Sequence, residues 1–288
     1  MNDIYKKLYT REEIYRPPIE RDSILLEVGY GCSYGKCGFC DFIKDSFFIF
    51  SNSEIKEKIS LLPRIAGDRN RLFCMGCNIL CLPVSRLIFF MDEIRRKLPM
   101  VSQISMYARA DDIIKKGAAN LQLLRKSGLT DLHVGVESGS DTVLALHTKG
   151  ETRNDMLAAF ALLDDAGISY HISLIPGLGG EKYSTEHAEE TASLLSLIQP
   201  KTIWNMGLKI WDGTPLEDMV ENGSFAPLTY AQMLREERYM LSLAEMKSPC
   251  LYVDSTALGK YTIRAFLPMQ KEILLAAIDK ILSEEDID

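Results

Sequence analysis

The feature that most constrains the fold is a regular alternation of short apolar segments with longer amphipathic ones. Six apolar segments are typical of buried strands, at residues 23–29, 71–75, 103–108, 132–136, 169–175 and 201–209. Helical patterns lie between and after them, at 54–62, 85–98, 120–127, 140–147, 153–166, 184–198 and 229–246, and Ser53 is the expected N-cap of the first. This alternation predicts βαβ units and a parallel sheet. Six units leave an open doubly wound sheet and an incomplete barrel as alternatives.

Three cysteines follow the first predicted strand. Cys32, Cys37 and Cys40 have the spacing C-x4-C-x2-C, and the glycine, serine, lysine and aromatic residues between them suit a tight loop. Thiolates are soft ligands that favour zinc or iron–sulfur clusters. A structural zinc ion normally takes four ligands, whereas a [4Fe–4S] cluster held by three cysteines would leave one iron open to an outside molecule. From spacing alone, the alternatives are an iron–sulfur cluster, zinc with a distant fourth ligand, and unliganded cysteines.

The cysteine loop resembles the cluster loop of the radical S-adenosylmethionine (radical SAM) superfamily, whose commonest form is C-x3-C-x2-C with an aromatic residue before the last cysteine. This chain keeps that aromatic residue as Phe39 and has one extra residue between the first two cysteines. The resemblance extends over about residues 22–245, with later landmarks at 107–109, 135–141, 149–150, 176–180 and 213–215. The order of these landmarks is similar to their order in a branch of the superfamily near the anaerobic coproporphyrinogen-oxidase-like and methylthiotransferase-like proteins.

The resemblance implies an α/β fold, an incomplete (β/α)6 TIM-like barrel with parallel strands, over residues 23–246. Residues 1–22 are then an N-terminal extension, and residues 247–288 a C-terminal tail whose one helix, at about 269–284, caps the open side or the mouth. Active sites of parallel barrels lie at the carboxyl ends of the strands, and every landmark falls at such an end.

The resemblance also implies two cofactors, a [4Fe–4S] cluster and S-adenosylmethionine (SAM). Cys32, Cys37 and Cys40 would bind three irons, and the amino and carboxylate groups of SAM would bind the fourth. One electron from the reduced cluster would cleave SAM into methionine and a 5′-deoxyadenosyl radical, which abstracts hydrogen from a substrate. The protein then binds the cofactors, aims them and excludes water.

Four residues stand where the resemblance implies contacts with the adenosine and amino parts of SAM. Phe39 is expected against the adenine side, although a loop aromatic packed on the core is the alternative. Gly76 and Asn78 form the turn that would bind the SAM amino group, and Asn78 stands where the family has a carboxylate. Gly177 would let the backbone approach adenine.

Three charged residues are further candidates for binding SAM. Arg109 and Glu137 end the third and fourth predicted strands, and a cation and an anion in one mouth suit a zwitterionic ligand. The alternative is an internal salt bridge between them. Lys149 lies where related motifs carry a basic residue near the SAM carboxylate, with a solvated lysine at a helix end as the alternative.

A second metal site is one interpretation of the spacing of Cys74, Cys77 and Cys81. Packing of these cysteines in the core or in a turn is the favoured interpretation, and a reactive thiol at Cys77 is a third. No catalytic side chain is assigned. Four residues are candidates to face the substrate, although an error of one residue in strand phase would reverse their direction: Tyr107, Trp204, Asn205 and Lys209.

Composition narrows the class of function. The chain has 288 residues, a net charge of −7 and seven cysteines, and the acidic balance argues against nucleic acid as a partner. No segment is typical of a signal peptide or a membrane span, so a reducing cytoplasm is expected.

We therefore expect a cytoplasmic radical SAM enzyme acting on a small molecule or peptide, with an electron donor such as flavodoxin or ferredoxin. Whether it is an oxidoreductase, a transferase or a lyase stays open. The alternative is a non-enzymatic zinc or iron–sulfur protein that uses the loop for structure or interaction.

Overall fold

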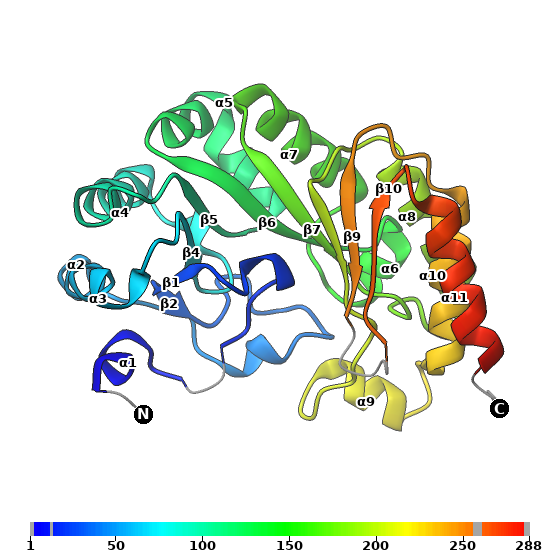
Figure 1. Cartoon of the computed structure of the whole chain (residues 1–288). Coiled ribbons are helices and arrows are strands. Elements are labelled where there is room, and N and C mark those ends of the chain that lie inside the picture. The colour runs from blue at the N-terminus through cyan, green and yellow to red at the C-terminus, as the bar shows by residue number, and fades with distance from the viewer. Residues whose placement is uncertain (1–2, 12–13, 256–260, 285–288) are drawn as a thin grey trace. The chain divides into compact units, whose positions relative to one another are not determined.

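The computed structural model describes residues 3–11, 14–255 and 261–284, in which strands and helices alternate along the chain (Figure 1). It divides into two compact units. The first contains residues 1–35, 42–134 and 161–170, and the second contains residues 36–41, 135–160 and 171–288. In the described ranges, no helix has both the length and the apolar character needed to cross a membrane.

The first unit is built on parallel strands. β1 (Ile24–Glu27), β4 (Arg71–Met75), β5 (Gln103–Ala108) and β6 (Leu129–Glu137) pair in that order, with Leu26 opposite Cys74 and Met106 opposite Leu132. Two short strands, β2 (Gly29–Tyr30) and β3 (Phe48–Ile49), form a separate antiparallel pair. Strand side chains such as Leu26 and Phe73 are fully buried and form the core.

The helices of the first unit lie before and between its strands in sequence. They are α1 (Asp3–Leu8), α2 (Asn52–Leu61), α3 (Pro63–Ala66), α4 (Val84–Lys97) and α5 (Ala110–Lys126), with single turns at η1 (Pro18–Glu20), η2 (Asp41–Lys44) and η3 (Ile79–Cys81). The helix α2 packs on α4, and α4 packs on α5. A reciprocal capping box between Ser51 and Glu54 starts α2, so Ser51 is the N-cap and the prediction of Ser53 was wrong.

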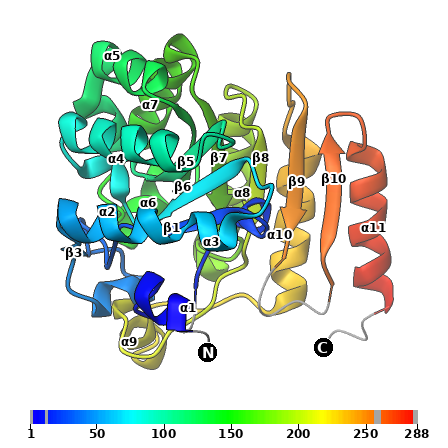
Figure 2. The ribbon, with the colours of Figure 1, turned by 60° about the vertical axis from the view of Figure 1, so that its left-hand side comes forward.

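In the second unit, β7 (Ser169–Leu174), β8 (Thr202–Asn205) and β9 (Cys250–Asp254) pair in parallel, and β10 (Ile263–Leu267) is antiparallel to β9. Its helices are α6 (Asp141–Leu146), α7 (Arg153–Ala166), α8 (Gly180–Leu195), α9 (Pro215–Glu221), α10 (Tyr230–Leu243) and α11 (Lys271–Glu284). The helix α10 packs on both α8 and α11, and Figure 2 shows α11 beside β10.

These elements agree with the predicted class, a mostly parallel α/β fold. The six predicted strands correspond to β1 and β4 to β8, and the predicted tail helix corresponds to α11. Two strands, β9 and β10, lie in the tail for which only a helix was expected. The domain boundaries at residues 22 and 246 stay a prediction.

The N-terminal segment is tied to three strands by Glu20. Its fully buried carboxylate accepts hydrogen bonds from Arg71 on β4 (2.5 and 2.9 Å) and from Ser105 on β5 (2.8 Å), and it pairs with His133 on β6 (2.6 Å). Burial by itself would raise the pKa of Glu20, but the hydrogen bonds of His133 and Arg71 outweigh burial and lower this pKa. Glu20 is therefore an ionised anchor shared by adjacent strands.

Candidate functional site

The cysteine loop begins directly after β2. Gly31 and Gly35 have φ values of +67° and +60°, a region that favours glycine, and a Cβ on Gly31 would lie 2.7 Å from the Ser46 carbonyl oxygen. Cys37 is buried, whereas Cys32 and Cys40 are partly exposed. The close turns and partial exposure are what a thiol loop needs to present sulfur ligands.

The second half of the loop is held by backbone hydrogen bonds within the second unit. The Gly38 N–H donates to the His147 carbonyl (2.8 Å), and the Gly38 carbonyl accepts from the Leu216 N–H (3.0 Å). Phe39 is mostly buried, and its ring meets the His147 ring edge-on at 5.9 Å. Phe39 therefore packs within the protein, and its contact with adenine stays a prediction.

The three thiols are the type of ligand that an iron–sulfur cluster takes, but their sulfur atoms do not form a metal-binding group in this structure. Within the described ranges, His, Cys, Asp and Glu side chains form no group of three or more that could hold a metal ion. Cys32, Cys37 and Cys40 stay the predicted ligands.

Among the other four cysteines, Cys74 and Cys81 have thiols whose pKa is raised by burial. Cys74 is buried within β4, and burial raises its pKa to about 12. Burial also raises the pKa of Cys81. Cys74 lies in the core, on strand β4, which agrees with the packing interpretation for this residue.

A buried amide follows β4. The turn starts at Gly76 (φ +139°), where a Cβ would lie 2.3 Å from Ile79 Cδ1. The Asn78 side chain is fully buried, and its Nδ2 donates to Ser33 Oγ (2.8 Å) and to Asp112 Oδ2 (2.6 Å). Among the described residues, Asn78 Oδ1 has no hydrogen-bond partner. A buried acceptor left unpaired destabilises a fold, so this oxygen calls for a donor that is not among these side chains.

Arg109 contacts the cysteine loop. Its Nε lies 3.1 Å from Asp111 Oδ1, and its guanidinium carbon lies 4.0 Å from the ring centroid of Tyr34, between Cys32 and Cys37 in sequence. This stacking is a cation–π contact, which is stronger when it is shielded from water. Arg109 is buried, so the contact braces the loop.

Glu137 and Lys149 form a buried ion pair at the end of β6. Lys149 Nζ lies 3.7 Å from Glu137 Oε1 and 3.4 Å from Glu151 Oε2, and Ser173 donates to Glu137 Oε2 (3.0 Å). Burial raises the pKa of Glu137, while Lys149 and Ser173 oppose the shift. Lys149 is only 5% exposed, so the alternative of a solvated lysine was wrong.

The Gly177 loop is held by an acid that sequence reasoning missed. Gly177 has a φ of +84°, and its N–H donates to Glu236 Oε1 on α10 (2.7 Å). Burial raises the pKa of Glu236 to about 7, although hydrogen bonds from Ser184 and Gly177 oppose the shift. His187 on α8 lies 3.6 Å from the same carboxylate, and burial lowers its pKa to about 4.

The four substrate candidates have diverse environments. Tyr107 packs edge-on against Phe73 at 5.1 Å, within the first unit. In the second unit, Trp204 Nε1 donates to Ser255 Oγ (2.9 Å), and Asn205 is fully buried. Lys209 is exposed, with its Nζ 3.6 Å from the Trp211 ring centroid. Their role toward a substrate stays a prediction.

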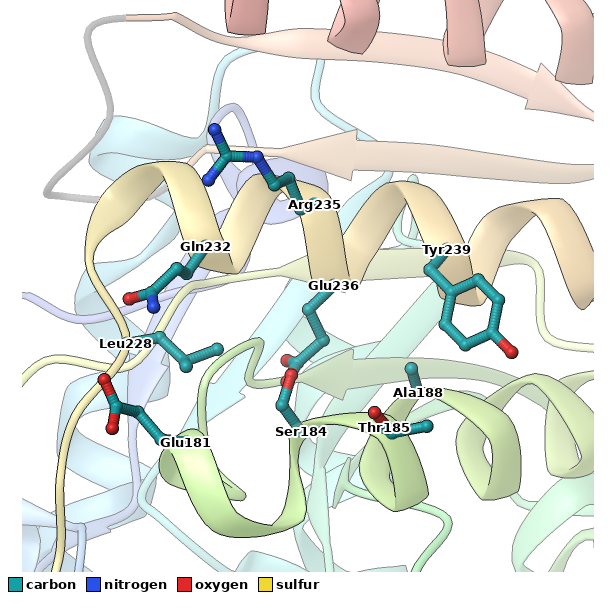
Figure 3. Close-up of a pocket in the computed structure, with 9 residues that line it drawn as sticks. All are labelled: Glu181, Ser184, Thr185, Ala188, Leu228, Gln232, Arg235, Glu236 and Tyr239. Carbon is teal, nitrogen blue, oxygen red and sulfur yellow. The ribbon is translucent and has the colours of Figure 1, made fainter. Parts of the chain in front are cut away.

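A cavity of about 360 Å³ lies between α8 and α10 (Figure 3). Figure 3 shows the Glu236 carboxyl group pointing toward Ser184 on the facing helix, while Arg235 points away from α8. None of the residues predicted to bind the cluster, SAM or the substrate lines this cavity: Glu181, Ser184, Thr185, Ala188, Leu228, Gln232, Arg235, Glu236 and Tyr239.

Comparisons with known proteins identify relatives. The chain is 27% identical to the heme chaperone HemW of Bacillus subtilis over 187 residues, which cover 58% of this chain and 49% of that protein. It is 24% identical to an uncharacterized protein of Methanocaldococcus jannaschii over 243 residues, which cover 80% of this chain and 72% of that one. The chain thus spans about half the length of the HemW that it matches.

A solved structure shows the same fold. The archaeal Methanocaldococcus infernus Elp3 with an N-terminal deletion matches 90% of this chain and 63% of its own, with a TM-score of 0.56 and 15% identity. This likeness concerns the fold and confirms the predicted fold class. The resemblance to the coproporphyrinogen-oxidase-like and methylthiotransferase-like branch stays a prediction.

A family model also matches the chain. The model described as the radical SAM superfamily matches residues 26–195, more than half of the chain, and this range contains the whole cysteine loop. The cofactors of this family are a [4Fe–4S] cluster and SAM. The chain therefore belongs to the radical SAM superfamily.

Proposed function

We propose that this enzyme cleaves SAM reductively and abstracts hydrogen from a small-molecule or peptide substrate. The observation that carries the proposal is the C-x4-C-x2-C loop inside the matched range, at residues 32–40 of 26–195. Three thiolates on a [4Fe–4S] cluster would leave one iron for SAM, which is what this chemistry requires.

The residues present fit both cofactors. Cys32, Cys37 and Cys40 would hold the cluster, and Asn78 Oδ1, a buried acceptor that lacks a partner among the described side chains, would accept a hydrogen bond from the SAM ammonium. When bound and reduced, the cluster and SAM together supply a 5′-deoxyadenosyl radical, with methionine as the other product. The chain's own residues bind, orient and shield these groups.

Each predicted contact has a physical role. Arg109, stacked on Tyr34, would brace the loop and offer positive charge to the SAM carboxylate. Glu137, whose negative charge Lys149 balances, would accept hydrogen bonds from the ribose hydroxyls. Phe39 would cover adenine, and the Gly177 backbone would approach it closely.

The electron is expected from a small one-electron carrier such as reduced flavodoxin or ferredoxin, in the cytoplasm. The reaction subclass, whether oxidoreductase, transferase or lyase, follows from the fate of the substrate radical. The chain spans only part of its relatives, so these assignments are proposals for the whole protein.

The test is reductive cleavage of SAM by protein purified and reconstituted without oxygen. With dithionite, we expect 5′-deoxyadenosine by mass spectrometry, and none from the C32A/C37A/C40A triple variant. Incubation with deuterium-labelled metabolites or peptides should then place deuterium in the 5′-deoxyadenosine. Tightly bound zinc in place of iron, with no 5′-deoxyadenosine, would instead support the non-enzymatic alternative.

A heme-binding role is a second candidate, favoured by the match to HemW. Titration of hemin into the purified protein, followed by absorption spectroscopy, tests this role. A saturable shift of the Soret band at about one heme per chain would support it, and unsaturable binding would reject it. The 5′-deoxyadenosine assay is read separately, so the two candidates are distinguished.

A further inference from the structure

We propose that Asp112 is a positioning residue, which holds the Asn78 amide so that its oxygen accepts a hydrogen bond from the SAM ammonium. The inference rests on the proposed function and assigns a role to a residue that no sequence motif singled out. Ser33, Asn78 and Asp112 all belong to the first unit, where their contacts are defined.

The argument starts from the two ends of an amide. The Asn78 side chain has a donor end, Nδ2, and an acceptor end, Oδ1, and rotation by 180° would exchange them. If Nδ2 occupied the acceptor's place, it would face a cationic ammonium with donors of its own. An asparagine can therefore bind an ammonium only if something else fixes which end is presented.

Asp112 supplies that constraint. An ionised carboxylate accepts hydrogen bonds and donates none, so the end of Asn78 that faces Asp112 Oδ2 at 2.6 Å must be Nδ2. Ser33 Oγ, at 2.8 Å, takes the second hydrogen of the same nitrogen. With both hydrogens used, the unpaired lone pairs are those of the buried Oδ1, the atom that has no partner within the described ranges.

Asp112 is itself held in place. It is the third residue of α5, near the helix N-terminus, where the helix dipole favours a negative charge. Lys115 Nζ lies 3.6 Å from its other oxygen, Oδ1, which leaves Oδ2 for Asn78. The neighbouring acid, Asp111, pairs with Arg109 and Lys115. The two adjacent carboxylates therefore share Lys115 but differ in their other partner, which is Asn78 for Asp112 and Arg109 for Asp111.

The position of Ser33 links this array to the cluster loop. Ser33 directly follows Cys32, so the Asn78 amide is bonded to the residue next to the first predicted iron ligand. Asp112, Asn78 and Ser33 thus form a chain of hydrogen bonds from α5 to the cysteine loop. A displacement of the Asp112 side chain would therefore move the Asn78 amide, which is the predicted binding group for the SAM ammonium.

The test compares SAM with an analogue in which hydrogen replaces the amino group. Binding to anaerobically reconstituted wild type and D112N is measured by equilibrium dialysis. D112N keeps the shape of the side chain but lets it donate, so it no longer selects the orientation of Asn78. We expect D112N to bind SAM about tenfold more weakly, the typical effect of one hydrogen bond to a charged group, and the analogue as tightly as wild type does.

Exchange of the two side chains supplies a rescue. In N78D/D112N, a carboxylate at position 78 accepts from the new amide and from Ser33 and still faces the ammonium. We expect this double variant to recover most of the SAM affinity, while N78D alone places two carboxylates together and does not. D92N, an exposed aspartate on α4, is the matched control and should leave both affinities unchanged.

The outcomes separate the two levels of proposal. If wild type holds its iron but does not bind SAM, the proposed function fails. If wild type binds SAM and D112N binds both ligands as wild type does, or loses both equally, the positioning role is overturned. If D112N does not fold, the double variant decides, because its failure to bind SAM would also overturn the role.

Discussion

Single residues in this chain show how burial and partners act in opposite directions on acids. Glu20 and Glu236 are both buried, yet the pKa of Glu20 is lowered by the hydrogen bonds of His133 and Arg71, which outweigh burial, whereas burial raises the pKa of Glu236 to about 7. Arg71 carries a fixed positive charge, while the pKa of His187 beside Glu236 is lowered by burial to about 4. The ionisation of Glu236 therefore changes within the neutral range.

The first prediction concerns E236Q and pH. The folded-state pKa of Glu236, about 7, lies above its ordinary value of 4.5, so between these pH values the folded protein keeps a proton that the unfolded chain has lost. Stability from this group is complete below about pH 4.5 and is lost as pH rises through 7. Relative to E236Q, wild type should lose up to about 3 kcal/mol of unfolding free energy between pH 4 and pH 8.

Urea unfolding at a series of pH values measures this difference. The matched control is E57Q, the same substitution at an exposed position of α2, for which the difference from wild type should stay nearly constant. Parallel curves for wild type and E236Q would show that the Glu236 carboxyl group does not retain its proton in the folded protein.

The second prediction concerns Gly135, two residues before Glu137. A Cβ at this position would lie 2.2 Å from Glu137 Oε1 and 3.2 Å from Lys149 Nζ, so G135A must displace the ion pair. We expect about 1–3 kcal/mol of destabilisation, the typical effect of overpacking, with weaker SAM binding. G223A is the control for SAM binding, because its Cβ meets no atom within 4 Å and its φ of +76° affects stability alone. Unchanged SAM affinity in G135A would argue against a contact between Glu137 and SAM.

At the scale of elements, the strands of the parallel sheet were predictable because each is a local apolar run. The strands β9 and β10 were missed although β10 alternates buried and exposed residues, since a tail of this length was read as a helical cap. The helix α5 starts at Ala110, ten residues before the prediction, and contains a break at Gly117 (φ +70°). Gly117 interrupts the helical pattern, which hid the first part of the helix.

In the candidate site too, some residues could be predicted from local sequence and others could not. Cys32, Cys37, Cys40 and Asn78 lie in short motifs that can be recognised locally. Asp112 and Glu236 act on partners that are 34 and 59 residues away in sequence, and no local pattern marks such pairs. A solvated Lys149 stayed open as an alternative to a SAM contact, because its two carboxylate partners come together only in the folded protein.

The third prediction tests the Glu20 anchor, which joins η1 to β4, β5 and β6. E20Q should destabilise the protein by about 1.5–3 kcal/mol at neutral pH, because the buried side chain loses its charge-assisted hydrogen bonds, and the partly buried Arg71 keeps, among the described residues, only Asp131 as an anionic partner. The folded-state pKa of Glu20 is lowered, so wild type should lose this advantage as pH falls below the ordinary value of 4.5. Urea unfolding of both proteins at pH 7 and pH 4 measures it.

The surface ion pair between Arg11 and Asp45 provides the control, since both side chains are partly exposed. D45N should cost less than about 1 kcal/mol. An equally small effect of E20Q would mean that the N-terminal segment contributes little to holding the strands.

For the molecule as a whole, the overall class of fold and the cofactor family were predictable, whereas the substrate was not. The fold class depends on a pattern repeated along the chain, and the cofactors depend on one short loop. The substrate candidates Tyr107, Trp204 and Lys209 have separate environments, so no single local pattern in the sequence points to a substrate.

The fourth prediction is the metal content of the whole chain. Reconstituted protein should hold about four irons and four sulfides, the content of one [4Fe–4S] cluster. The C77A variant should keep this content, and C32A/C37A/C40A should lose it. Iron and sulfide assays without oxygen decide the matter, and about eight irons per chain, reduced to four in C74A/C77A/C81A, would establish a second cluster.

The hydrogen bond from Gly177 to Glu236 has a consequence for biosynthesis. Its two partners are 59 residues apart, so a ribosome releases the Gly177 turn well before α10 emerges. Until then the Gly177 turn lacks this hydrogen bond. If the Gly177 backbone contacts adenine as proposed, fragments that stop before residue 230 should bind SAM more weakly than the whole chain.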